Sequence, residues 1–417
     1  MSASTERKNR MAARADGTDK KSIAAMKEEK KRKKEKTRWT VVGILLVVLV
    51  ALVIYLNSGA FYRNLNGYTV EYPANEEYSI EAGSHSFSVA EVNYLYNMQY
   101  VNMVNTYGNY ISMLGLDTTQ PLDQQPCTIS ETEDEDYTWH DYFMDSATSQ
   151  LKSLVAFEAY AEANDITIDK EAEASIDETI DSITSTAKEN NYPSANKFLA
   201  ANYGEGCNTD VVRSIMKLQL IANAVQQSIS NTFEYTDTQI KDKYAEVKDD
   251  YDTFTYSFYF VEAATETDEN GEDAAPTEEA LAAAAQTAND ILAKLNDETD
   301  ISAAAAQVVD GAEATEQTAV AGSSVEAGIA EWLKSADRAA GDTAVVEADN
   351  GAYVIKFDAR DNGQHTTEES GDMNYCDFVA DKLLRNDDLN KWGESVFAGI
   401  LEQFTDSKPF GARYIGR

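Results

Sequence analysis

The chain has 417 residues, enough for two or three domains, and 43% of them are hydrophobic, enough for packed cores. Its formal net charge is −37, but residues 1–38 hold 14 Lys or Arg against 6 Asp or Glu, a net of +8 that leaves −45 for the rest. Because an acidic body repels the nucleic-acid backbone, we expect no nucleic-acid partner. Two interpretations of the negative charge are open. It only keeps the surface solvated, or it also favours cationic, unfolded segments as ligands.

Residues 39–56, WTVVGILLVVLVALVIYL, form an uncharged run directly after a basic flank. As a helix that rises about 1.5 Å per residue, the run nearly crosses a hydrocarbon layer of about 30 Å. The basic flank then predicts a single-pass protein of the cell membrane, with a cytoplasmic N-terminus and extracytoplasmic C-terminal domains. A cleaved signal peptide is the alternative, because Ser58-Gly59-Ala60 is an acceptable cleavage site.

The basic arm before this run, residues 1–38, is predicted to be disordered and to lie near anionic lipid headgroups. Membrane lipid is therefore an expected partner of both the arm and the anchor. A cytoplasmic protein is the alternative partner of the arm. The sequence does not decide between the two.

The three cysteines, Cys127, Cys207 and Cys376, lie far apart and form no CxxC motif. This spacing excludes thioredoxin-like and metal-binding interpretations. One optional disulfide or three free thiols are both compatible with the sequence.

The segment after the anchor begins with residues 57–85, whose pattern predicts one or two short strands. Ser88 to Glu91 form a capping box that opens a helix running to about Leu114. Thr138 begins a second helix, and its apolar residues recur every three or four positions. Further patterns of this kind predict an all-helical domain of about six helices at residues 86–250.

The pattern changes at Tyr251, where YDTFTYSFYFV alternates aromatic and polar residues like a strand. Alanine-rich helices follow, and GDTAVVEADNGAYVIKF predicts two strands joined by an Asn-Gly turn. The order β-α-α-(α)-β-β predicts a small α+β domain. One or two amphipathic helices close the sequence. The predicted fold class is mainly α, with a small α+β domain.

This order resembles the membrane-attached foldases of the SurA/PrsA type, in which a helical peptide-binding domain surrounds a parvulin-type prolyl isomerase domain. SHSFSVAEVNYLYN resembles the strand and first helix of that family, TDTQIKDKYAEVKDDYDTFTYSFYFV its link into the parvulin strand, and GDTAVVEADNGAYVIKF the last two parvulin strands. LVAFEAYAEANDITIDKEAEASIDETIDSI resembles its helical core. The resemblance covers roughly residues 75–405.

Charge, hydropathy and the resemblance together predict six segments in the chain. In order they are a basic cytoplasmic arm (1–38), a transmembrane anchor (39–56), a juxtamembrane segment with short strands (57–85), a helical SurA/PrsA-like chaperone domain (86–250), a parvulin-like α+β domain (251–360) and C-terminal helices that pack on the helical domain (361–417).

Active parvulins resemble one another in two histidines, one on the first strand and one on the last. Here Phe258 follows Ser257 on the first strand, and Tyr353 stands on the last. The resemblance therefore implies a degenerate peptidyl-prolyl isomerase domain of weak or no activity, without catalytic residues. An active isomerase with a divergent pocket is the alternative, because rotation over the barrier of about 18–20 kcal/mol needs no covalent step.

A stretch rich in tyrosine and methionine, NYLYNMQYVNMVNTYGNYISM, spans residues 93–113. Flexible thioethers and amphipathic aromatic rings suit a promiscuous surface for unfolded chains. At 100° per residue, four of these side chains share one helical face. Together with Trp332 they are the candidate substrate-binding residues: Tyr96, Tyr100, Met103, Tyr107 and Trp332. Ordinary helix core is the alternative interpretation of the stretch.

The sequence thus favours a membrane-anchored extracytoplasmic chaperone that binds unfolded or secreted polypeptides weakly, without ATP or another cofactor. The alternatives are the active isomerase and a non-catalytic scaffold for a folded envelope partner. The acidic runs at residues 131–136 and 266–273 are interpreted as solvated loops, because the second lacks the bidentate glutamate of a calcium loop. No metal site is expected.

Overall fold

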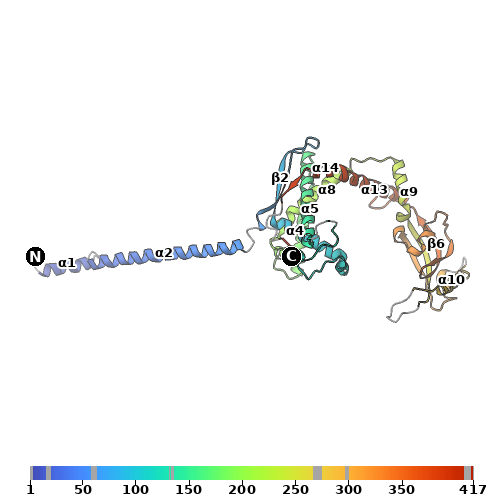
Figure 1. Ribbon diagram of the computed structural model, residues 1–417, viewed down its shortest axis with the longest axis horizontal. Coiled ribbons are helices and arrows are strands. Elements are labelled where there is room, and N and C mark those ends of the chain that lie inside the picture. The colour runs from blue at the N-terminus through green and yellow to red at the C-terminus, as the bar shows by residue number, and fades with distance from the viewer. Residues whose placement is uncertain are drawn as a thin grey trace. The chain divides into compact units, whose positions relative to one another are not determined.

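The computed structural model describes residues 3–15, 20–57, 63–130, 132, 136–265, 275–295, 300–407 and 415–416. Its internal contacts divide the chain into two compact units (Figure 1). Unit 1 consists of Met1–Ser228 and Val396–Arg417, and unit 2 of Ile229–Ser395. Most of the two acidic runs at 131–136 and 266–273 falls outside the described residues.

The N-terminal part is helical, as α1 (Ala3–Ala15) and α2 (Lys20–Asn57), so the prediction of a disordered arm is wrong. Ala, Lys, Glu and Arg are strong helix formers, and Glu28 and Arg32 add an i,i+4 ion pair at 3.5 Å. Within the described residues, Lys30–Tyr55 is long and apolar enough to cross a membrane by length and composition. Its mean hydropathy is 2.4, and none of it is buried.

Unit 1 contains a three-stranded antiparallel sheet of order β2-β1-β7. Strands β1 (Asn66–Tyr72) and β2 (Gly83–Ser88) confirm the predicted short strands. Strand β7 (Thr405–Asp406) was not predicted, because two residues are too short for a hydrophobic pattern. The Tyr68 hydroxyl on β1 donates to the Asp406 carboxylate at 2.8 Å and ties β7 to the sheet.

The helices of unit 1 begin where the sequence places their caps. Ser88 forms a capping box with Glu91 before α4, and Thr138 caps α5 through the backbone N–H of Asp141. The helices are α4 (Val89–Tyr107), α5 (Trp139–Ala163), α6 (Lys170–Glu189), α7 (Ala195–Tyr203), α8 (Thr209–Ser230, whose last residues reach unit 2) and α14 (Ala398–Leu401). Short 3-10 helices are η1 (Gly108–Leu114) and η2 (Leu122–Gln124).

Unit 2 contains a four-stranded antiparallel sheet of order β4-β3-β6-β5. Its elements are α9 (Asp237–Tyr251), β3 (Thr253–Glu262), α10 (Glu278–Leu292), α11 (Ile301–Ala305), β4 (Thr315–Ala321), η3 (Gly322–Ser324), α12 (Ala327–Lys334), β5 (Thr343–Ala348), β6 (Gly351–Asp361), α13 (Tyr375–Trp392) and the π-helix η4 (Gly393–Phe397). The predicted strand order lacked β4. Among the described residues this edge strand pairs with β3, and most of its sequence, TEQTAVA, is not buried. It therefore lacks the alternation of apolar and polar residues by which a strand is predicted.

Both faces of the unit 2 sheet are covered. One face buries Phe254, Tyr256 and Ile355 against α12, and the other buries Ala352 and Val354 against α10 and α11. Helix α13 packs on α9 inside unit 2, whereas α14 contacts α5 in unit 1. The predicted domain boundary at residues 250–251 stays a prediction.

Candidate functional site

Phe258 and Tyr353, the residues that the sequence resemblance sets against the parvulin histidines, lie side by side on one face of the unit 2 sheet. Phe258 on β3 and Tyr353 on β6 meet edge to face, with ring centroids 5.6 Å apart, and Phe260 lies 4.5 Å from Tyr353. Tyr353 is 7% exposed, and its hydroxyl donates to Glu326 at 3.4 Å. Burial and the Glu326 carboxylate raise the pKa of Tyr353. This place therefore holds packed rings and a protonated phenol, without an imidazole.

Trp332, the candidate from this unit, stands on α12 and is partly buried at the edge of the same cluster. The Arg338 guanidinium lies 4.5 Å from the centre of the indole ring. A cation over an aromatic face is attractive, so this face of Trp332 already has a partner. Its role in binding a substrate stays a prediction.

The four candidates on α4 are split between core and surface. Tyr96 is 0% and Tyr100 is 6% exposed, and their rings pack against Phe143 at centroid distances of 5.8 and 5.6 Å. In this structure both are core residues, and their role in binding a substrate stays a prediction. Met103 is partly buried and Tyr107 is exposed.

Exposed large hydrophobic side chains gather just beyond the end of α4. Tyr107, Tyr110, Met113 and Ile129 are exposed by 43, 70, 80 and 39%, and we refer to them as the Tyr/Met patch. Tyr107 is the last residue of α4, and Tyr110 and Met113 stand three residues apart on η1, the spacing that aligns side chains in a 3-10 helix. The Thr128 hydroxyl donates to the Leu114 carbonyl at 2.5 Å, which holds the segment next to Ile129 against η1.

Sequence reasoning missed most of this patch because it assumed an α-helix through to Leu114. At 100° per residue, Met113 leaves the face of Tyr110, whereas at 120° the two lie in one row. The signal that marks the change is Gly108, which stands at φ +49° where α4 ends.

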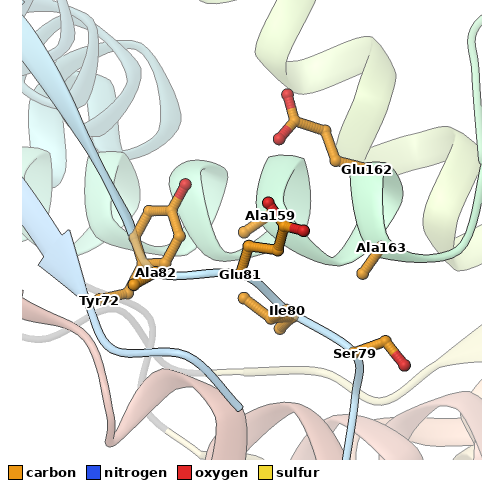
Figure 2. A pocket seen from close by; sticks show the side chains of 8 residues that line it. All are labelled: Tyr72, Ser79, Ile80, Glu81, Ala82, Ala159, Glu162 and Ala163. Carbon is orange, nitrogen blue, oxygen red and sulfur yellow. The ribbon is translucent and has the colours of Figure 1, made fainter. Parts of the chain in front are cut away.

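A cavity of about 410 Å³ lies elsewhere in unit 1, between the β1–β2 connection and α5 (Figure 2). Its apolar lining comes from Tyr72, Ile80 and three alanines of the two segments. Figure 2 shows the carboxylates of Glu81 and Glu162 on these same two segments. The cavity was not predicted from the sequence, because its two sides are about eighty residues apart and carry no motif.

The surroundings of this cavity are electronegative. Burial, then Glu162 and Glu158, raise the pKa of Tyr72. His85 Nδ1 lies 2.8 Å from Glu158, and this hydrogen bond raises the pKa of His85 although burial opposes it. A cavity with apolar walls and carboxylates suits the aliphatic stem and charged head of a lysine or arginine side chain.

The described residues contain no group of three or more His, Cys, Asp or Glu side chains placed to hold a metal ion. Cys127, Cys207 and Cys376 are free thiols in the structure. Burial raises the pKa of the Cys207 thiol to about 12, so it stays protonated at neutral pH.

Comparison with solved structures returns SurA- and PrsA-type proteins. They include the peptidylprolyl isomerase PrsA of Bacillus cereus (16% identity, 66% of this chain and 90% of that chain, TM-score 0.30). They also include one of the SurA-like chaperones PEB4 and Cj1289 of Campylobacter jejuni (11%, 64% and 87%, TM-score 0.24) and the foldase protein PrsA of Streptococcus pneumoniae (13%, 63% and 88%, TM-score 0.23). No family model and no curated protein matches the chain. The solved structures are of the type that the sequence resembles, and at these TM-scores no residue's role is carried over from them.

Proposed function

We propose that the chain is a membrane-anchored extracytoplasmic chaperone that binds unfolded secreted polypeptides through the Tyr/Met patch. The observation that carries this proposal is the exposure of Tyr107 at the end of α4 and of Tyr110 and Met113 on η1. Methionine and tyrosine adapt to many apolar partners, which is what a binder of unfolded chains requires.

The charge of the chain supports the same function. The part after residue 38 carries a net charge of −45, and the unit 1 cavity places Glu81 and Glu162 beside apolar walls. Opposite charge speeds the encounter with a cationic segment, and the exposed rings then hold its apolar side chains. Binding of this kind needs no nucleotide.

The apolar part of α2 supports attachment to the cell membrane. Because basic residues lie on its N-terminal side, the proposed orientation has the N-terminus in the cytoplasm and the chain after Leu56 outside, near the place where secreted chains emerge. Anchoring confines the weak binding surface to the membrane plane, which raises the local concentration of binding sites.

We assign weak or no isomerase activity to the sheet domain of unit 2. The packing of Phe258 and Phe260 on Tyr353 fills the place of the two histidines with rings. Twisting a prolyl amide needs a cavity that takes the proline ring and removes water from the amide. An active isomerase with a divergent pocket is the second candidate, and the measurement that closes the Discussion separates the two.

The double substitution Tyr110→Ser with Met113→Ser is expected to weaken binding of unfolded polypeptide by about thirtyfold, because each removes roughly 1 kcal/mol of apolar burial. The measurement is light scattering of a chemically unfolded reporter enzyme, diluted into increasing amounts of residues 60–417. Both side chains are exposed by 70% or more, so the fold of unit 1 is expected to be unchanged.

Met373→Ser is the matched control. This methionine is 40% exposed but lies in unit 2, outside the patch. The control is expected to suppress aggregation like the unsubstituted protein. Equal suppression by the double variant contradicts the assignment of the binding surface to the patch.

A further inference from the structure

A short segment far along the chain, Ile415–Gly416, lies in the core of unit 1. Ile415 is 6% exposed and belongs to the main hydrophobic cluster of that unit. The Gly416 N–H donates to the Asn93 side-chain oxygen on α4 at 3.0 Å. A Cβ at Gly416 would lie 3.3 Å from His140 Nδ1 and 3.6 Å from the Tyr96 hydroxyl. We call the place formed by Asn93, Tyr96 and His140 the tail slot.

The slot is specific about the residue in the Gly416 position. The backbone there has φ +116°, a conformation that side chains other than glycine rarely adopt. The would-be Cβ also meets the imidazole of His140, which is held by the Tyr96 hydroxyl at 3.1 Å. The Gly416 position therefore selects glycine, and the buried Ile415 position suits an aliphatic side chain.

The floor of the slot contains buried amides. Asn93 and Asn97, one turn apart on α4, are 1% and 0% exposed. Asn97 Nδ2 donates to the carbonyl and side-chain oxygens of Asn93 at 2.9 Å, which orients the acceptor that Gly416 uses. Among the described residues, Asn93 Nδ2 and Asn97 Oδ1 have no hydrogen-bond partner. A buried helix face favours aliphatic side chains over asparagine. The two buried asparagines therefore point to recognition of a main-chain amide.

The described contacts that hold the tail are few: one aliphatic side chain and one hydrogen bond to Asn93. Seven residues separate Ser407, at the end of the β7 segment, from Ile415. A short tether of this kind supplies an effective concentration on the order of millimolar, which keeps a weak ligand bound. A segment of the same chemistry from another chain therefore has to displace a weakly held tail at this effective concentration. It does not have to break a large interface.

We propose that the tail slot is a binding site for an extended client segment in which an aliphatic residue precedes glycine, and that Ile415–Gly416 occupies it at rest. The inference rests on the proposed function, which supplies the unfolded clients that contain such a segment. It adds a second, sequence-selective site on α4, apart from the Tyr/Met patch. Clients that carry this pair displace the tail, and clients without it bind the patch alone.

The test uses the full chain in lipid nanodiscs and a fluorescent peptide, ARYIGR, with the sequence of residues 412–417. Ile415→Asp removes the tail from the core, so its anisotropy titration is expected to show at least about tenfold tighter peptide binding than the unsubstituted chain. Met373→Asp, at an exposed position of unit 2, is the matched control and is expected to leave binding unchanged. ARYIAR is expected to bind the Ile415→Asp chain at least about tenfold more weakly than ARYIGR, because alanine disfavours the required φ.

Two results overturn the proposal. One is that the Ile415→Asp chain and the unsubstituted chain bind ARYIGR with equal affinity. The other is that the Ile415→Asp chain binds ARYIGR and ARYIAR with equal affinity. Near-ultraviolet circular dichroism checks the fold, and the milder Ile415→Ala, with an intermediate gain expected, replaces the aspartate variant if that one unfolds. A dimer that dissociates on Ile415→Asp assigns the slot to a second copy and overturns the client as its source. The Tyr110→Ser/Met113→Ser variant is expected to bind ARYIGR like the unsubstituted chain, so failure of the patch and failure of the slot are distinguishable.

Discussion

Arg360→Ala is expected to destabilise unit 2 by about 3–5 kcal/mol, because it leaves a buried carboxylate without its charge partner. Arg360 on β6 donates to Asp252 at 2.6 Å, to Asp249 at 2.7 Å and to the Lys334 carbonyl at 3.1 Å. Asp252 is 2% exposed and also accepts from the Tyr244 hydroxyl at 2.6 Å. The guanidinium thus joins α9, α12 and the sheet.

Hydrogen exchange followed by mass spectrometry on residues 60–417 measures this effect locally. Peptides from β3 and β6 are expected to lose protection, whereas peptides from α4 and α5, in unit 1, keep it. Lys382→Ala is the control, because its ion pair with Glu369 is exposed and contributes about 1 kcal/mol or less. Unchanged protection of β3 and β6 in the Arg360 variant contradicts the structural role of this cluster.

Phe143→Ala is expected to destabilise unit 1 by about 3–5 kcal/mol through the cavity that it leaves. Phe143 is 0% exposed and lies at the centre of a cluster of rings. The centroid of its ring is 5.4 to 5.8 Å from those of Tyr96, Tyr100, Trp139 and Tyr142. The same exchange experiment is expected to show loss of protection in α4 and α5.

Tyr110→Ala is the contrasting variant for Phe143→Ala. Its ring is 70% exposed on η1, so a change in stability within about 0.5 kcal/mol is expected. A loss of protection in α4 and α5 as large as that of Phe143→Ala means that the Tyr/Met patch is part of the core. That outcome removes the surface on which the proposed function depends.

Local signals in the sequence predicted the starts of helices and the paired strands well. Ser88 and Thr138 cap the helices that they were expected to cap, and a tight turn joins β5 to β6 near the predicted Asn-Gly, with Ala348 opposite Gly351. These features depend on neighbouring residues only, so a single sequence contains the information for them.

Features built by distant or weakly patterned residues were beyond the sequence. Strand β4 is a poorly buried edge, and β7 and Ile415 depend on partners more than three hundred residues away. At the candidate site, the period of the Tyr/Met stretch fitted core and surface equally well. The structure divides the stretch, with Tyr96 and Tyr100 inside and Tyr107 and Tyr110 outside. The division falls within α4, between Tyr100, which packs on Phe143, and the exposed Tyr107.

The central claim is that the extracytoplasmic part binds unfolded polypeptide without isomerising it. Exchange NMR on an unfolded, apolar peptide with one Xaa-Pro bond tests both halves in a single sample containing residues 60–417. Uncatalysed cis–trans exchange takes tens of seconds or longer, so even a modest catalyst is detected. We predict broadened peptide resonances, which report binding, and an unchanged exchange rate. Faster exchange that disappears when Tyr353 is replaced, or resonances that stay sharp at every protein concentration, contradicts the account.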